Sequence, residues 1–341
     1  MKPVIAFVTG GYSSEAVISY KSAITIQQHI DRDRYEAYTI DITPRGWFYT
    51  DDQGMKTEVN RADFTLPLGG RIIHFDAVLI GIHGTPGEDG KLQGYFDLLN
   101  IPYTSCDAAS SAITFNKRYT VAVAAFAGIH VARSVHIFRH SPLAPEAILQ
   151  QLNLPVFVKP NNGGSSIGMS KVQQPEDLAG ALQKAFQEDD QVLVEEFISG
   201  REFTVGVLRR GDEIIVLPIT EVRTHRDFFD FQAKYEGDNE EITPAEIAEA
   251  KANNIRAAAR RIYASLNCRG VVRIDFIYNE AQDAPYMLEI NTVPGQSEAS
   301  IVPQQVKKMG WSLKELYSVL IEEALQRKTA APAKDQGSGY F

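Results

Sequence analysis

The sequence is poor in cysteine, because only Cys106 and Cys268 occur among its 341 residues. Two cysteines are too few for a disulfide framework, and neither is closely paired with histidine as in a zinc site. No apolar run approaches the roughly 20 residues of a membrane helix, and the N-terminal apolar run is too short for a signal peptide. We therefore expect a protein of the reducing cytoplasm that does not associate with a membrane.

The sequence also lacks a basic excess, since 43 acidic residues outnumber 34 lysines and arginines and give a net charge of −9. This balance argues against a nucleic-acid-binding surface but leaves room for local basic pockets that hold phosphates. No internal repeat is visible. The length suits two or three domains that share a cleft.

Two consecutive segments, residues 271–278 and 286–291, have the polar–apolar alternation of β-strands. Paired as a hairpin, they bring four polar side chains to one face: Arg273, Asp275, Glu289 and Asn291. Oxygen ligands of this kind suit Mg²⁺, which completes its coordination with water and substrate phosphates. The pattern predicts a floor for a metal-bound nucleotide. The alternative is a pair of ordinary strands whose acids face solvent.

The N-terminal part alternates strands with helical stretches. Residues 4–8, 37–42 and 75–81 are strand-like, which favours an α/β fold with a doubly wound parallel sheet over the first hundred or so residues.

Gly-rich turns follow the first and third of these strands, at residues 10–15 and 83–90. A turn between a strand and a helix N-terminus suits an anion, although neither turn has the G-x-G-x-x-G pattern of a dinucleotide site. Glu15 in the first turn either contacts a ligand or complements the helix dipole. His83 in the second either contacts substrate or anchors its loop.

A candidate phosphate site lies in the middle of the chain. Lys117 falls in a predicted helix at residues 116–128, and Lys159 ends a strand that leads into the Gly- and Ser-rich loop 161–168. Such a loop can fold its amides over phosphates with the lysine beside it. It is not a Walker loop, because the lysine precedes the glycines. The alternative is a Gly-rich hairpin without a ligand.

Residues 191–198 form a further predicted strand, whose backbone suits an adenine edge, while Glu195 or Glu202 suits ribose hydroxyls. Either acid is equally compatible with a plain surface role. Residues 223–244 mix aromatic and charged side chains without a period, which indicates a lid that excludes water or a loosely packed surface loop.

Taken together, these motifs resemble those of the D-alanine–D-alanine ligase family of the ATP-grasp superfamily. The resemblance runs from about residue 4 to about residue 327. The motifs occur in the family's order: Gly-Gly-x-Ser-x-Glu at 10–15, His-Gly-x-x-Gly-Glu-Asp-Gly at 83–90, Lys-Pro with Gly-Ser-Ser-x-Gly at 159–168, Lys-Tyr at 234–235, Arg-x-Asp at 273–275, and Glu-x-Asn-Thr-x-Pro-Gly at 289–295. Gln296 stands where methionine is usual, which leaves the specificity of the second substrate site open.

The resemblance implies a role for each matching position. ATP would be bound by Lys117, Lys159, Ser166, Glu195, Glu196, Ile198, Glu202 and Lys234. A pair of Mg²⁺ ions, for which Mn²⁺ can substitute, would be bound by Asp275, Glu289 and Asn291. The first D-alanine would meet Glu15 and His83, and the second Ser300 and Ile301. Catalysis would involve Glu15, Ser165, Tyr235, Arg273 and the Gly295 amide.

The same resemblance implies a two-part ATP-grasp fold, α+β in character, after the N-terminal sheet. The expected divisions are 1–110 for a substrate domain, 111–198 for a central subdomain, 199–328 for a catalytic domain and 329–341 for a flexible tail. The implied reaction joins two D-alanines through an acyl phosphate, at the cost of ATP, for peptidoglycan precursors. A homodimer fits the family.

Three alternatives remain open at this point. A related ligase would accept D-serine or D-lactate as its second substrate. A nicotinamide-dependent oxidoreductase would use the N-terminal sheet, but Asp41 lies further from Gly10 than the roughly 20 residues usual for a ribose ligand. A non-catalytic nucleotide sensor would need only the floor and the phosphate loop.

Overall fold

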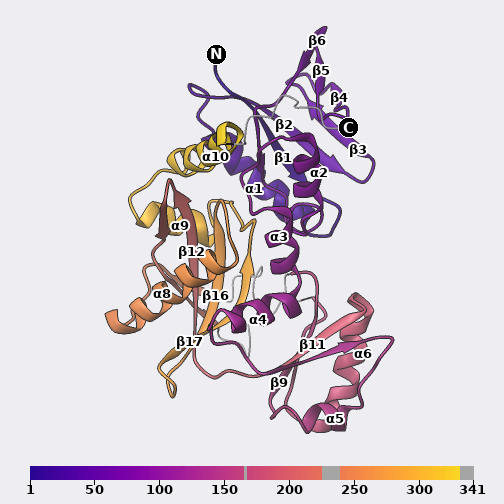
Figure 1. Ribbon diagram of the computed structural model, residues 1–341, viewed down its shortest axis with the longest axis vertical. Helices are drawn as coiled ribbons and strands as arrows, with labels where there is room; N and C mark the ends of the chain where they lie inside the picture. Colours follow the sequence, from indigo (N-terminus) through magenta and orange to yellow (C-terminus); the bar gives the residue numbers. More distant parts are fainter. Residues whose placement is uncertain (165–166, 225–238, 331–341) are drawn as a thin grey trace, which may run out of the picture.

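The computed structural model describes residues 1–164, 167–224 and 239–330. It contains three main sheets, which follow one another along the chain (Figure 1). Residues of the second and third sheets and of loops beside the first line a central cleft. None of the helices in these ranges combines the length and apolar composition that a membrane crossing requires.

The N-terminal sheet has the strand order β4-β3-β2-β1-β7. Its strands are β1 (Val4–Gly10), β2 (Glu36–Thr43), β3 (Gly46–Thr50), β4 (Lys56–Glu58) and β7 (Ala77–Ile80). Only β2, β1 and β7 run parallel, whereas β3 and β4 are antiparallel additions. The expected parallel sheet is thus wrong for this edge, because the two-residue link between β2 and β3 is long enough for a hairpin and too short for a crossover.

Helices cover both faces of this sheet. On one face, α1 (Ala16–His29) and α10 (Leu313–Ala330) pack against Ile5, Phe7 and Leu79. On the other, α2 (Lys91–Leu99) contributes Leu92 and Phe96 to a core with Ala6, Val8 and Ile80, beside the small hairpin of β5 (Leu66–Leu68) and β6 (Arg71–Ile73). The last helix thus returns to the first sheet. It also extends to Ala330, so the expected tail begins inside this helix.

The second sheet is antiparallel and has the order β10-β9-β11-β8. Its strands are β8 (Ser134–Phe138), β9 (Val156–Pro160), β10 (Ser170–Val172) and β11 (Gln191–Glu196). Valines of β9 and β11 pack beneath α5 (Pro145–Leu149) and α6 (Leu178–Glu188), which follows a short 3₁₀ turn at Pro175–Asp177. The opposite face of this sheet lines the cleft.

The third sheet is also antiparallel, with the order β15-β14-β12-β16-β17 and β13 beside β12. Its strands are β12 (Arg201–Arg210), β13 (Glu213–Val216), β14 (Thr220–Thr224), β15 (Asn239–Ile242), β16 (Val272–Asn279) and β17 (Ala284–Asn291). The long helix α8 (Glu249–Ser265) covers one face, where Phe203, Ile274 and Phe276 are buried. The helices α3 (Ala108–Phe115) and α4 (Lys117–Phe126) connect the N-terminal sheet to the second.

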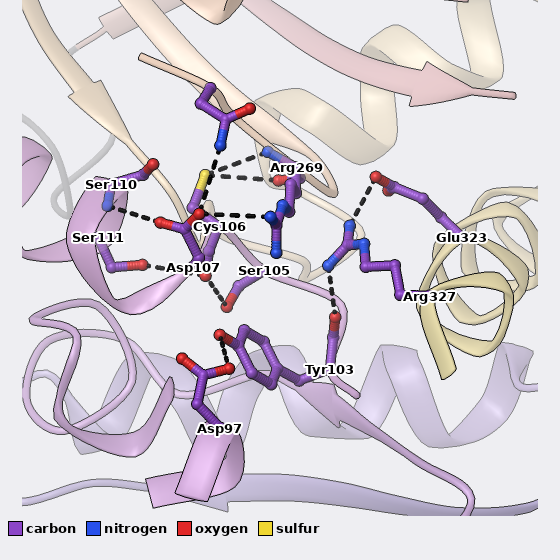
Figure 2. A network of polar contacts seen from close by, with 11 residues as sticks. Asp97, Tyr103, Ser105, Cys106, Asp107, Ser110, Ser111, Arg269, Glu323 and Arg327 are labelled. Carbon is purple, nitrogen blue, oxygen red and sulfur yellow. Dashed lines mark hydrogen bonds and ion pairs between the residues drawn. The ribbon is translucent and has the colours of Figure 1, made fainter. Parts of the chain in front are cut away.

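Polar contacts connect residues 103–107, after the N-terminal sheet, to the residues just before β16 (Figure 2). Asp107 caps α3 and lies 3.4 Å from the guanidinium of Arg269. The Arg269 amide also donates to Cys106 Sγ at 3.4 Å, and Arg327 of α10 bonds both the Tyr103 carbonyl and Glu323. These contacts set the position of β16 relative to the first sheet.

Candidate active site

The predicted β16–β17 hairpin is confirmed and forms the floor of the cleft. We use "floor" for Arg273, Asp275, Glu289 and Asn291. Arg273 is paired with Asn291 across the two strands, and Asp275 with Glu289. A bulge after this second pair places Leu288 as well as Glu289 toward the cleft, while Met287 turns into the core. The alternation of the sequence predicts the floor but does not reveal the bulge.

Arg273 is the electrostatic centre of the floor. Its Nη2 lies 2.8 Å from Asp275 Oδ2 and 3.5 Å from Glu289 Oε1. Burial acts to lower the pKa of Arg273, but the charge and hydrogen bonds of Asp275 and the charge of Glu289 outweigh it and raise the pKa. Asp275 is further bonded by the Thr204 hydroxyl of β12. The guanidinium is therefore held as a permanent cation in the cleft.

Two adjoining cavities lie over the floor. The first, of about 230 Å³, is lined by the floor, by Glu15 and His83 from the N-terminal sheet, and by Gly295 and Ser300. The second, of about 580 Å³, lies between the second and third sheets and shares Asp275 and Glu289 with the first. A ligand that spans both would pass directly over the floor.

The second cavity combines apolar walls with lysines at one end. Phe157, Ile198 and Leu288 are among its apolar lining residues, which suits a flat aromatic ring. Lys159 forms an ion pair with Glu195, and Lys117 Nζ donates to the Gly163 carbonyl at 2.6 Å. The structure therefore brings both predicted lysines to the second cavity, and Lys117 also lines the first.

The remaining residues predicted to bind ATP differ in their placement. Glu202, Glu195 and Ile198 line the second cavity. Glu196 also contributes to its lining, but the carboxylate is engaged by Asn153 Nδ2 at 3.0 Å and by Arg133 at 3.6 Å. Its side chain is thus held by the neighbouring loop. Ser165, Ser166, Lys234 and Tyr235 lie outside the described residues.

Another side of the first cavity comes from the segments that follow β1 and β7. We use "wall" for Glu15, His83 and Glu88. The carboxylate of Glu15 lies so close to two loops that a Cβ added at Gly84 would be 2.5 Å from its Oε2, and one at Gly164 would be 2.7 Å from its Oε1. Glycine at both positions thus lets the loops approach the acid.

The other two wall residues are buried, and burial shifts both pKa values toward the neutral form. It lowers the pKa of His83 to about 4, and together with the charge of Glu15 it raises that of Glu88 to about 8. Glu88 also accepts a hydrogen bond from the Gly84 amide at 2.5 Å. We did not assign Glu88 a role from the sequence, although the Gly-Glu-Asp-Gly motif contained it.

Beyond Asn291 the chain passes through residues 292–296 to α9 (Ile301–Lys308). Gly295, Ser300 and Ile301 line the first cavity, and their roles stay a prediction. Ser300 is the N-cap residue of α9, and its hydroxyl lies 2.7 Å from that of Ser297. A Cβ on Gly295 would be 2.8 Å from Ser300 Oγ, so a larger residue would collide there.

The chemistry of the floor fits a hard divalent cation. Two carboxylates and one amide supply oxygen donors on a single face, although Asp275 shares its oxygens with Arg273 and Thr204. Within the described ranges no three His, Cys, Asp or Glu side chains form a metal cluster by themselves. A cation here would therefore rely on Asn291 and on phosphate oxygens as well.

Two family models match the chain and together cover most of it. The model described as D-ala D-ala ligase N-terminus matches residues 4–106, and the model described as D-ala D-ala ligase C-terminus matches residues 115–322.

Curated proteins and solved structures agree with these matches. A D-alanine–D-alanine ligase of Phocaeicola vulgatus is 43% identical over 94% of this chain and 99% of its own length. One from Christiangramia forsetii is 42% identical over 96% of this chain and 100% of its own. The VanG D-Ala:D-Ser ligase from Enterococcus faecalis superposes with a TM-score of 0.83 at 32% identity, covering 95% of this chain and 100% of that one. The D-alanyl-alanine synthetase A from Vibrio cholerae gives 0.84 at 27%, covering 95% and 99%.

Proposed function

The chain belongs to the D-alanine–D-alanine ligase family, and from that premise we propose how its residues perform the reaction. It is an ATP-dependent ligase that joins two D-alanines for peptidoglycan synthesis. The observation that carries the proposal is the floor, which lies between a cavity with two lysines and a cavity with an acid at its wall.

The first step overcomes the low reactivity of a carboxylate toward an amine. A carboxylate oxygen of the first D-alanine takes the γ-phosphoryl group of ATP, ADP leaves, and an acyl phosphate forms. Lys117 and Lys159, which line the second cavity, offset the negative charge that accumulates during this transfer. Glu15 in the first cavity accepts the ammonium group of this D-alanine, with His83 in the same wall.

The second step forms the amide. The amine of the second D-alanine attacks the carbonyl carbon of the acyl phosphate, loses a proton, and phosphate departs. Arg273 and the Gly295 amide bind the oxygen that becomes negative, while Ser300 and Ile301 receive the second carboxylate. From the family pattern, Ser165 and Tyr235 join Glu15, and Ser166 and Lys234 contact the phosphates.

Asp275, Glu289 and Asn291 are the residues that would hold Mg²⁺ or Mn²⁺. When bound, such ions neutralise phosphate charge and orient the γ-phosphoryl group. The floor residues themselves supply the oxygen donors and keep Arg273 charged beside them.

We base the proposed oligomeric state and domain division on the family. We expect a homodimer in the cytoplasm, with no nucleic acid and no membrane as partner. The ATP-grasp division places residues 1–110, 111–198 and 199–328 in three domains, with α10 returning to pack on the first.

A D-serine acceptor is the second candidate. It is raised by the similarity in structure to a D-Ala:D-Ser ligase and by Gln296, which stands where methionine is usual in the family. Product analysis by mass spectrometry, with D-alanine, L-alanine, D-serine and D-lactate offered in pairs, separates the candidates. We expect D-alanyl-D-alanine to dominate at neutral pH; a predominant D-alanyl-D-serine or ester product would overturn this choice.

A further inference from the structure

The segment at residues 292–296 carries the Gly295 amide from the floor to α9, and residues of the N-terminal part bind its backbone. The Gln296 amide donates to the Ser22 hydroxyl of α1 at 3.0 Å. The Val293 amide donates to Asn291 Oδ1 at 3.0 Å and approaches Glu88 Oε1 at 3.4 Å. The segment is therefore held between α1 and the wall.

His83 links these two attachments. Its Nε2 lies 3.0 Å from Ser22 Oγ, and the backbone of Val293 lies near its ring. The Val293 amide hydrogen is directed elsewhere, to Asn291 and Glu88.

The central hydroxyl of this network is that of Ser22, which accepts the Gln296 amide and is hydrogen-bonded to His83 Nε2. Burial lowers the pKa of His83 to about 4, so the ring is neutral near pH 7. A neutral imidazole bonded to Ser22 therefore helps to hold the segment in place.

The surroundings leave these groups little freedom. Ser22 is 1% exposed, His83 4% and Gln296 5%. The His83 amide donates to Ser19 Oγ at 2.9 Å, which ties the histidine to α1 a second time. The Gln296 side chain bonds Tyr317 of α10 and the Pro294 carbonyl, each at 3.3 Å. Loss of one member would leave buried polar groups unpaired.

We propose that Ser22 is a positioning residue, which acts through His83 and the Gln296 amide to aim the Gly295 N–H at the reacting carbonyl oxygen. The inference rests on the proposed ligase function, because that reaction gives the Gly295 amide an oxyanion to bind. Ser22 does not line either cavity. Its effect therefore belongs to the chemical step and not to the binding of ATP.

The test compares Ser22→Ala with Ser318→Ala, which removes another buried hydroxyl, bonded to the Lys314 carbonyl within α10. We expect kcat to fall on the order of tenfold to a hundredfold in Ser22→Ala, with the KM for ATP nearly unchanged. Ser318→Ala should retain both values. Unchanged kcat in Ser22→Ala, or an equal loss in Ser318→Ala, would overturn the positioning role.

A spectroscopic measurement tests the same inference without activity. ¹⁵N NMR of the wild-type protein reports the protonation state of each of the 7 histidines, and the His83 signal is identified by its loss in His83→Gln. We expect a neutral His83 ring at pH 7. A ring protonated on both nitrogens would overturn the inference even if Ser22→Ala failed to fold. Absence of D-alanine-dependent turnover in the wild type would instead overturn the ligase reaction and leave the NMR result standing.

Discussion

The floor and the wall both contact the Val293 amide, through Asn291 and Glu88, but they differ in how their ionisable side chains are stabilised. On the floor, Arg273 has Asp275 and Glu289 at 2.8 and 3.5 Å, so its charge is balanced by neighbours. In the wall, burial leaves His83 neutral and Glu88 largely protonated near pH 7. The floor keeps its charges by pairing them, whereas His83 and Glu88 of the wall are neutral and only Glu15 keeps its charge.

This difference indicates that the two regions have different roles. A charged floor can bind phosphate oxygens, a cation and a developing oxyanion, which require fixed charges in a site shielded from water. The neutral pair His83 and Glu88 can hold the backbone of residues 292–296 by hydrogen bonds without adding charge beside the substrate, while Glu15 supplies the charge that meets the ammonium group. We therefore expect substitutions on the floor to affect the reaction most, and substitutions of His83 and Glu88 to affect stability and alignment.

The largest effect should come from Arg273→Ala. It removes an oxyanion donor, so we expect kcat to fall by on the order of 10²–10³ while the affinity for ATP is mostly kept. Steady-state kinetics and equilibrium ATP binding measure the two quantities. Arg209→Ala, on β12 near Tyr263, is the matched control and should retain activity. Near-normal turnover of Arg273→Ala would contradict the role of the floor.

Next in size is the effect of Glu289→Gln on the metal requirement. Because a neutral amide binds a divalent cation less strongly, the Mg²⁺ concentration for half-maximal activity should rise about tenfold or more. A Mg²⁺ titration of ADP release measures it. Glu280→Gln, in the turn of the same hairpin and paired with Lys251, should leave the titration unchanged. A wild-type titration curve for Glu289→Gln would remove this acid from the proposed cation site.

The wall predicts an effect on stability that depends on pH. The folded-state pKa of Glu88, about 8, lies above its ordinary value of 4.5, so folding is favoured by the proton that Glu88 retains. This contribution is complete below pH 4.5 and is lost as the pH rises through 8; its size is on the order of a few kcal/mol. Urea unfolding between pH 5 and 8.5 should show a smaller decline for Glu88→Gln than for the wild type. Parallel curves would contradict a protonated Glu88.

The smallest effect distinguishes two neighbouring acids of β11. Glu195→Gln breaks the buried pair with Lys159 and should raise the KM for ATP roughly tenfold. Glu196→Gln should change it less than about twofold, because that carboxylate pairs with the largely exposed Arg133. Equal effects of the two substitutions would show that the side-chain directions are not those described.

A feature of this site could be predicted from the sequence when it depends on residues that are close together along the chain. The floor could be predicted, because the period-two alternation of a single hairpin determines which side chains share a face. The antiparallel edge of the first sheet was missed, since the helix–strand alternation of the neighbouring segments favoured parallel pairing. The bulge at Leu288 leaves no signature in composition.

The contacts around the wall were harder to predict for a different reason. Ser22 is one of two serines on α1, and only the approach of Gln296, 274 positions away, gives it a role. Glu88 likewise depends on Gly84 nearby and on Val293 far along the chain. The resemblance to the ligase family located both loops, but their hydrogen bonds arise from packing between distant segments.

The most direct test of the account is ADP release by the purified protein in a coupled assay with ATP and Mg²⁺, with and without D-alanine. We predict that D-alanine accelerates ADP release many-fold and that each ADP is matched by one D-alanyl-D-alanine. A rate of ADP release that is the same with and without D-alanine would contradict the account.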